Sequence, residues 1–111
     1  MSGLPSPQRT VVAVATTSTV VTSRDVRSVE WMTLQVDNLD ATQTFVGQIE
    51  RRQSEEMSWS VSTIGDFAEI PASGSVTADL DVVGTGFIRL VGTMSGAGGD
   101  VAIAARLGVR K

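Results

Sequence analysis

The amino-acid sequence predicts an all-β protein: an antiparallel β-sandwich of about eight strands, jelly-roll-like, with a flexible N-terminal arm. Three observations support this prediction. Val, Ile and Thr, whose branched side chains favour strands over helices, make up 33 of the 111 residues. Short segments of alternating apolar and polar residues recur, with turn residues between them about every 8–12 positions. No segment has the pattern of a helix of three turns.

The length and the N-terminal composition predict the domain organisation. A chain of 111 residues is expected to fold as one domain, which we place at residues 10–111. Residues 1–9 are predicted to form the flexible arm, because prolines lack the backbone donor of a strand and the stretch has little to bury. The arm carries Leu4, Pro5, Pro7 and Arg9. It either frays in solvent or orders against a neighbouring subunit.

The stretch from Thr85 to Val109 has the strongest pattern in the chain. We predict two strands, at 87–94 and 100–109, joined as a hairpin by the glycine-rich turn at 95–99. The second strand alternates with a period of two, which is typical of a half-buried strand. Its predicted core face consists of Val101, Ile103, Ala105 and Leu107.

The rest of the chain is predicted to form further short strands. The clearest central strand is 29–37, where Met32, Leu34 and Val36 alternate with larger or polar side chains. An alternative exists near Ser23, which could cap a helical turn that runs through Val26. The predicted strands before the hairpin are 10–15, 16–22, 29–37, 43–53, 57–63, 67–70 and 76–82.

The composition limits the chemistry that the chain can perform. It has no cysteine and no histidine, so common metal sites and Ser-His-Asp or Cys-His nucleophiles are not expected. We expect no enzyme activity and no cofactor. The net charge is −3 and no basic stripe indicates nucleic acid. No apolar run approaches a membrane span and no signal peptide is visible, so synthesis in the cytoplasm is expected.

Three polar groupings are candidates for a site. Asp79 and Asp81 share one face of a predicted strand, where a solvated face is favoured over a catalytic pair. The turn at 37–40 could offer oxygens to calcium, but it lacks regular ligand spacing, so plain turn chemistry is favoured. Arg51-Arg52 beside Glu55-Glu56 forms either a solvated loop with local ion pairs or an intersubunit contact.

The two tryptophans have two interpretations as well. Trp31 and Trp59 each fall in an alternating segment, which favours packing on a sheet face or in the core. The alternative is a sugar-stacking platform. Further exposed aromatic residues, which a carbohydrate-binding face needs, do not accompany either of them.

Three segments, taken in order, resemble a group of small virion structural proteins of tailed bacteriophages with jelly-roll or immunoglobulin-like sandwiches. The first is TLQVDNLDA at 33–41, a strand that enters a turn. The second is 45–59, a strand, a polar loop and a strand that begins with tryptophan. The third is 72–110, which includes the strand FIRLV at 87–91 and the glycine-rich turn.

This resemblance implies a capsid decoration (cement) protein that binds the outer surface of a bacteriophage capsid and stabilises the shell. Its partners would be the major capsid protein and further copies of itself, with a homotrimer favoured, and neither nucleic acid nor membrane. The alternatives are a tail, neck or head-fibre component, or a carbohydrate-binding module. The candidate interface residues are Leu4, Pro5, Pro7, Arg9, Arg51, Arg52, Glu55 and Glu56.

Overall fold

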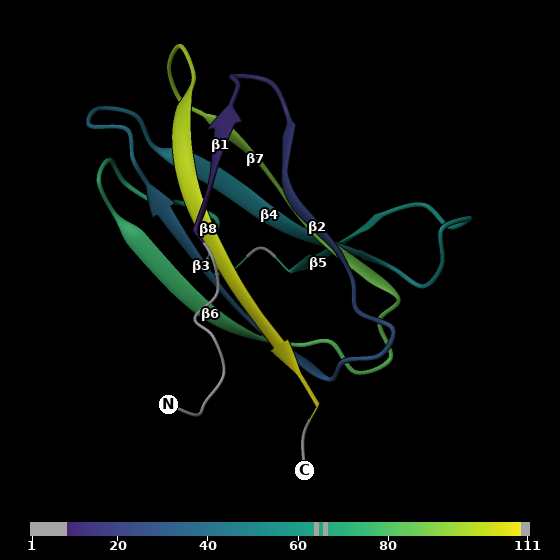
Figure 1. The fold of residues 1–111 in the computed structure, drawn as a ribbon. Coiled ribbons are helices and arrows are strands. Elements are labelled where there is room, and N and C mark those ends of the chain that lie inside the picture. The colour runs from purple at the N-terminus through teal and green to yellow at the C-terminus, as the bar shows by residue number, and fades with distance from the viewer. Residues whose placement is uncertain (1–8, 64, 66, 110–111) are drawn as a thin grey trace, which may run out of the picture.

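The computed structural model describes residues 9–63, 65 and 67–109, and within them the chain forms eight strands and no helix. Short loops connect most strands, whereas the connection between β4 and β5 projects from the sandwich (Figure 1). The strands are β1 (Thr10–Val14), β2 (Thr19–Asp25), β3 (Trp31–Asn38), β4 (Phe45–Arg52), β5 (Ser60–Thr63), β6 (Ser75–Asp81), β7 (Phe87–Met94) and β8 (Gly99–Gly108).

The strands form two four-stranded antiparallel sheets that face each other (Figure 1). One sheet has the order β1-β8-β3-β6 and the other β2-β7-β4-β5. The pairs β1–β8, β2–β7, β3–β6 and β4–β5 are those of a long hairpin rolled up on itself, which is the jelly-roll arrangement. The predicted fold class is therefore confirmed.

The predicted hairpin of 87–94 and 100–109 is wrong, although both strands form. β7 pairs with β2 and β4, while β8 pairs with β1 and β3 in the opposite sheet. The glycine-rich connection crosses from one sheet to the other, and Gly98 uses a φ of 102° to do so. Alternation within a strand shows which face is buried, but it does not show which strand lies alongside.

Several boundaries also differ from the sequence prediction. The second strand begins at Thr19 and continues through Asp25, so the alternative of a helical turn from Ser23 to Val26 is wrong. A register shift between Val20 and Thr22 interrupts its pairing with β7 and obscures the alternation. The predicted strand at 67–70 is reduced to one bridge, between Ile70 and Phe45.

The core lies between the inner faces of the sheets. Met32, Leu34 and Val36 of β3 are fully buried, as their alternation predicts. Val101 and Ile103 of β8 are buried too, and Ala105 and Leu107 pack against the same cluster. The central strands thus place their small branched side chains inward and leave the outer faces for other roles.

One large ring fills the space beneath the second sheet. The Phe45 side chain is fully buried and lies under two glycines, Gly47 of β4 and Gly92 of β7. A Cβ on either glycine would lie 2.5 Å from a ring carbon of Phe45. The two residues face each other in the β4–β7 register, so the missing side chains create the room for the ring.

Candidate interaction surfaces

An arginine–aromatic stack lies on the outer face of the sheet β2-β7-β4-β5; it consists of Arg27, Phe87, Arg52, Trp59 and Arg89. The Arg52 guanidinium lies 4.4 Å from the Trp59 ring centroid and 5.3 Å from that of Phe87. Arg27 covers Phe87 at 4.9 Å, and Arg89 contacts Trp59 at 4.4 Å. Cations over aromatic faces attract electrostatically, so the stack holds three long side chains in defined positions.

The local backbone explains why these residues meet. Arg52 and Phe87 are directly opposed in the β4–β7 register, as are Glu50 and Arg89. Residues two apart on a strand share a face, so all four side chains point away from the core. Trp59 immediately precedes β5, the neighbour of β4 at this edge. Positions 87 and 89 alternate with the buried Ile88 and Leu90, a signal in the sequence that our prediction did not use.

Two of the three arginines in the stack carry a carboxylate partner. Arg89 Nε donates to Glu50 at 2.6 Å, and both side chains are largely buried. Arg27 forms a forked pair with Asp25, with its Nη2 at 2.5 Å from a carboxylate oxygen. Hydrogen bonds from the Arg27 side chain and backbone lower the pKa of Asp25 to about 2.

Arg52 differs from its two neighbours. Among the described residues, the one hydrogen bond of its guanidinium runs from Nη1 to the backbone oxygen of Glu55, at 3.1 Å, and its buried Nε has no acceptor there. The local ion pairs that one interpretation placed within 51–56 are absent from the described residues. The salt bridges there are Arg27–Asp25 and Arg89–Glu50. Glu55 and Glu56 are exposed on the projecting loop. The stack therefore holds one guanidinium without a carboxylate.

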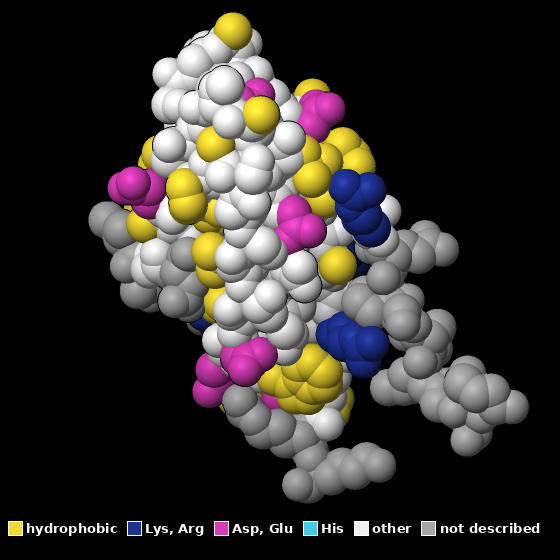
Figure 2. Space-filling view, turned by 90° about the vertical axis from the view of Figure 1, so that its left-hand side faces the viewer, with side chains coloured by type: hydrophobic (Ala, Val, Ile, Leu, Met, Phe, Trp, Pro, Cys, Tyr) yellow, Lys and Arg dark blue, Asp and Glu magenta, His cyan; other side chains and the backbone are white. Residues whose placement is uncertain are grey.

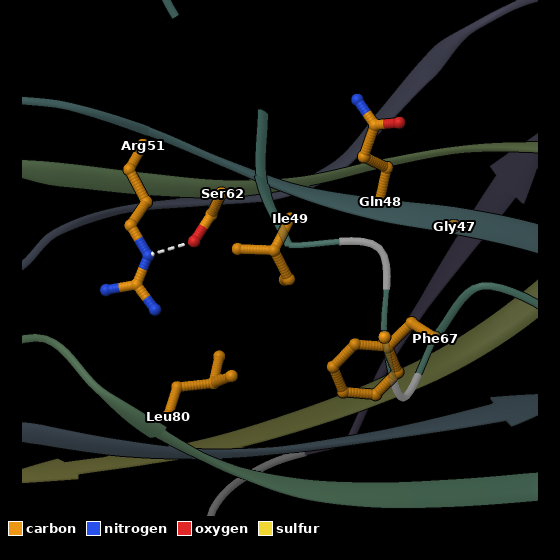
Figure 3. Close-up of a pocket in the computed structure, with 8 residues that line it drawn as sticks. Gly47, Gln48, Ile49, Arg51, Ser62, Phe67 and Leu80 are labelled. Carbon is orange, nitrogen blue, oxygen red and sulfur yellow. Dashed lines mark hydrogen bonds between the residues drawn. The ribbon is translucent and has the colours of Figure 1, made fainter. Parts of the chain in front are cut away.

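Arg51 points in the opposite direction, toward the space between the sheets. Its Nε donates to Ser62 Oγ at 2.7 Å, and its Nη1 donates to the Asp81 backbone oxygen at 2.6 Å and to Thr85 Oγ1. Figure 3 shows the side chain between β4 and β6, at one end of a cavity of about 180 Å³ whose walls include Ile49, Phe67 and Leu80. Arg51 thus ties the two sheets together at their open side.

The predicted arm residues fall largely outside the described part of the chain. Leu4, Pro5 and Pro7 lie outside the described residues. Arg9 is exposed and lies close enough to Asp37 to contribute to the lowered pKa of that carboxyl group. The main causes of that lowered pKa are hydrogen bonds from Ser75 and Gln35.

Exposed valines lie beside the stack on the same outer face. Val20, Val46 and Val61 are each about half exposed, at 48, 48 and 54%. Val20 is opposed to Val91 in the β2–β7 register, and Val91 is opposed to Gln48 of β4, two residues from Val46. These neighbours give the face an apolar part next to its arginines.

The outer face of the other sheet carries mostly small or polar side chains, together with the exposed Val11 and the half-buried Trp31. Thr33 Oγ1 donates to Asp79 at 2.7 Å across β3 and β6, and the Ser75 hydroxyl donates to Asp37. Figure 2, which looks at the side nearest β6, shows mostly backbone and side chains that are neither charged nor hydrophobic, with carboxylates, arginines and hydrophobic side chains in separate areas. Asp79 and Asp81 are exposed, which agrees with the solvated face that the sequence favoured.

The other candidate sites are structural in this arrangement. Trp31 is half-buried and packs over Gly108, where a Cβ would lie 2.5 Å from an indole carbon. Asp40 accepts from the Thr42 and Gln43 backbones, and these bonds lower its pKa. No group of three or more acidic, cysteine or histidine side chains among the described residues is placed to hold a metal ion.

The turn at 37–40 belongs to a polar network at one end of the sandwich. Asn38, the one buried polar residue of the described core, donates through Nδ2 to the backbone oxygens of Gln43, Ile70 and Pro71. Gln43 Oε1 accepts from Gly96 and Gly98 in the glycine-rich connection. These bonds join three loops, so the polar groups of Asn38 and Gln43 have hydrogen-bond partners within the chain. No helix in the described residues is long and apolar enough to cross a membrane.

Comparison with known proteins yields likeness in structure only. No protein-family model matches the chain, and no curated protein matches it. PirA matches with a TM-score of 0.62 at 11% identity over 95% of this chain and 97% of that one. The SPBc2 prophage-derived protein YomS matches with a TM-score of 0.51 at 12% identity over 96 and 100% of the two chains. A protein of Bacillus endospore appendages that form disulfide-linked pili has a TM-score of 0.49 at 12% identity over 99 and 98%.

These structural neighbours are small β proteins whose length is close to that of this chain. At such low identity the likeness establishes a shared fold and nothing about activity or partners. The chain is therefore a small eight-stranded jelly roll with a stacked, partly apolar outer face on one sheet and a polar outer face on the other.

Proposed function

We propose that the chain is a structural component of a phage particle, and specifically a decoration protein that binds the outside of the capsid and stabilises the shell. The observation that carries the proposal is the outer face of the sheet β2-β7-β4-β5. Arginines and aromatic rings, which are enriched at protein interfaces, lie there beside half-exposed valines that add apolar surface. The likeness to a prophage-derived protein and the resemblance of three segments to virion proteins are consistent with this role.

The arginine without a carboxylate supports the choice of this face. The rings on either side of Arg52 restrict its side chain, so binding costs little of its conformational entropy. A planar guanidinium in a fixed position suits a carboxylate or backbone oxygen on the major capsid protein. Many symmetric copies would add the strength that one small contact lacks.

Mass spectrometry of purified particles tests the proposal. We expect the protein in mature particles at a copy number close to that of the major capsid protein. A few copies per particle would instead indicate a tail, neck or head-fibre component, and absence from particles would rule out a virion role.

Matched variants test the face. Arg52→Ala is expected to lower occupancy on purified shells, whereas Arg106→Ala, an exposed arginine on the other sheet, should leave it unchanged. Equal occupancy of the two variants would show that the shell binds elsewhere. Deletion of residues 1–9 examines the arm separately, and we expect lower occupancy with an intact fold.

A second candidate function is carbohydrate binding beside Trp31. A groove there is lined by Trp31, Thr33, Asp79 and Asp81, which offers a ring together with hydroxyl and carboxylate oxygens. Trp59 is less suitable, because two guanidinium groups already contact its ring. Glycan-array binding that disappears in Trp31→Ala, with circular dichroism unchanged, would favour this function.

A further inference from the structure

β6 is the sheet edge least protected against pairing with another chain. It pairs with β3 alone among the described strands, over seven residues without a register shift. The other edges are interrupted or shorter: β2 contains a register shift, β1 has five residues and β5 has four. β6 also contains no proline and no lysine, which are residues that commonly block such edges.

The direction of its backbone groups follows from the flanking bonds. Gly74 accepts from Asn38, and Val82 donates to Glu30, so the even-numbered residues direct their backbone groups toward β3. Successive residues of a strand point to opposite sides, so Thr77 and Asp79 direct their N–H and C=O groups toward the open edge. The backbone oxygen of Asp81 also points away from β3, because it accepts a hydrogen bond from Arg51 of the opposite sheet.

We propose that β6 pairs antiparallel with β6 of a second copy, about a two-fold axis at Ala78, to form one continuous eight-stranded sheet. This inference goes beyond the proposed function and does not depend on it. In this register Thr77 lies opposite Asp79 of the second copy, and Ser75 lies opposite Asp81. The strand is thus self-complementary over its whole length of seven residues.

The opposed side chains repeat contacts that the sheet already makes. On its other side β6 places Asp79 opposite Thr33 and Ser75 opposite Asp37, and in both pairs the hydroxyl donates to the carboxylate. The proposed dimer repeats this pairing at Thr77, whose hydroxyl would donate to Asp79 of the second copy, while Ser75 keeps its bond to Asp37. A register shifted by two residues would instead oppose Asp79 to Asp79, which is unfavourable.

The same arrangement buries apolar side chains on the inner face of β6. Val76 and Leu80 are half-buried at the open side of the sandwich, and Leu80 lines the cavity shown in Figure 3. The register places Val76 opposite Leu80 of the second copy on that inner face. Each copy therefore removes apolar surface of the other from water while both strands complete their backbone hydrogen bonds.

Sedimentation of the full chain over a range of concentrations tests the pairing. We expect a dimer, whereas the trimer implied by the family resemblance needs a contact between unlike surfaces. Thr77→Asp opposes two carboxylates twice per dimer and should weaken association about tenfold, while Thr77→Lys should strengthen it. Thr10→Asp, on the opposite edge of the same sheet, is the control and should have no effect.

A cross-link tests the register. The native chain has no cysteine, and the Cα atoms of a pair at the axis would lie about 4.5 Å apart, within the range of a disulfide. Ala78→Cys should therefore give a dimer band on non-reducing gels, although residue 78 is 5% exposed in one copy. Ala104→Cys, on the more exposed outer face of β8, should not. A monomer at all concentrations, equal effects of the two Thr77 variants, or equal cross-linking of the two cysteine variants would overturn the proposal.

Discussion

The two outer faces of this jelly roll satisfy their polar groups in different ways. On the face of β1-β8-β3-β6, short hydroxyls donate to carboxylates directly across the strands, as Thr33 does to Asp79. On the face of β2-β7-β4-β5, long arginines lie against aromatic rings, and Arg52 has no carboxylate partner among residues 9–63, 65 and 67–109. The first face is dominated by hydroxyl–carboxylate pairs, whereas the second combines stacked guanidinium groups with exposed valines. The two outer faces of one fold therefore differ in chemistry.

Each sheet has a glycine that makes room for a ring, Gly92 for Phe45 in the core and Gly108 for Trp31 on the outer face, and this difference allows the test with the largest expected effect. Gly92→Ala is expected to destabilise the protein by about 2–3 kcal/mol, because the buried Phe45 ring has no space to move. Gly108→Ala should cost less, since the half-buried Trp31 can turn toward solvent. Urea unfolding of both variants measures the difference. Equal losses of unfolding free energy in the two variants would show that the Phe45 and Trp31 rings are equally confined.

Removal of the central arginine tests whether the stack stabilises the second face. Arg52→Ala should lower the free energy of unfolding by about 1–2 kcal/mol, because two ring contacts and the packing of its stem are lost. The fluorescence of Trp59 should shift toward that of a solvated indole in the folded state. Arg106→Ala on the polar face is the control, and it should stay within about 0.5 kcal/mol of the native chain. A silent Arg52→Ala would mean that the stack forms only with a partner.

A smaller effect is expected on the polar face. Thr33→Val keeps the shape of the side chain but removes its hydrogen bond to Asp79, and we expect a loss of about 0.5–1 kcal/mol in urea unfolding. Asp79→Asn should cost less than this, because its amide oxygen still accepts from the Thr33 hydroxyl. A greater loss in Asp79→Asn would show that the charge, rather than the hydrogen bond, stabilises this face.

A fall in pH is expected to have the smallest and most local effect on stability. The pKa of Asp25 is lowered to about 2 by Arg27, so the stability that this carboxylate contributes is complete above about pH 4 and is lost as the pH falls toward 2. The lowered pKa values of Asp37 and Asp40 act in the same direction. Asp25→Asn should therefore flatten, without abolishing, the fall in melting temperature between pH 4 and 2. An unchanged slope would show that the Asp25–Arg27 pair is fully screened by solvent.

The comparison also shows how far local pattern could predict the candidate surfaces. The positions of Arg51 and Arg52 were recognised, but their opposite directions were not. Neighbours on a strand face opposite sides, so one arginine joins the sheets at the open side and the other joins the stack. Phe87 is about 35 residues away along the chain and is brought opposite Arg52 by the β4–β7 register, while Arg27, which follows β2, covers the same ring. Of the two interpretations of Glu55 and Glu56, the local ion pairs are absent from the described structure, and the intersubunit contact stays a prediction.

The sequence by itself determined the all-β class, most strand positions and the inward faces of β3 and β8, because the period-two alternation of small branched residues is a local property. The tertiary structure alone decided which strands lie side by side. β7 and β8, adjacent in the chain, belong to different sheets because each is a central strand with two neighbours from elsewhere in the chain. Strand pairing depends on long-range packing, and that pairing assembles the arginine–aromatic stack and gives β6 a single neighbour, β3, among the described strands.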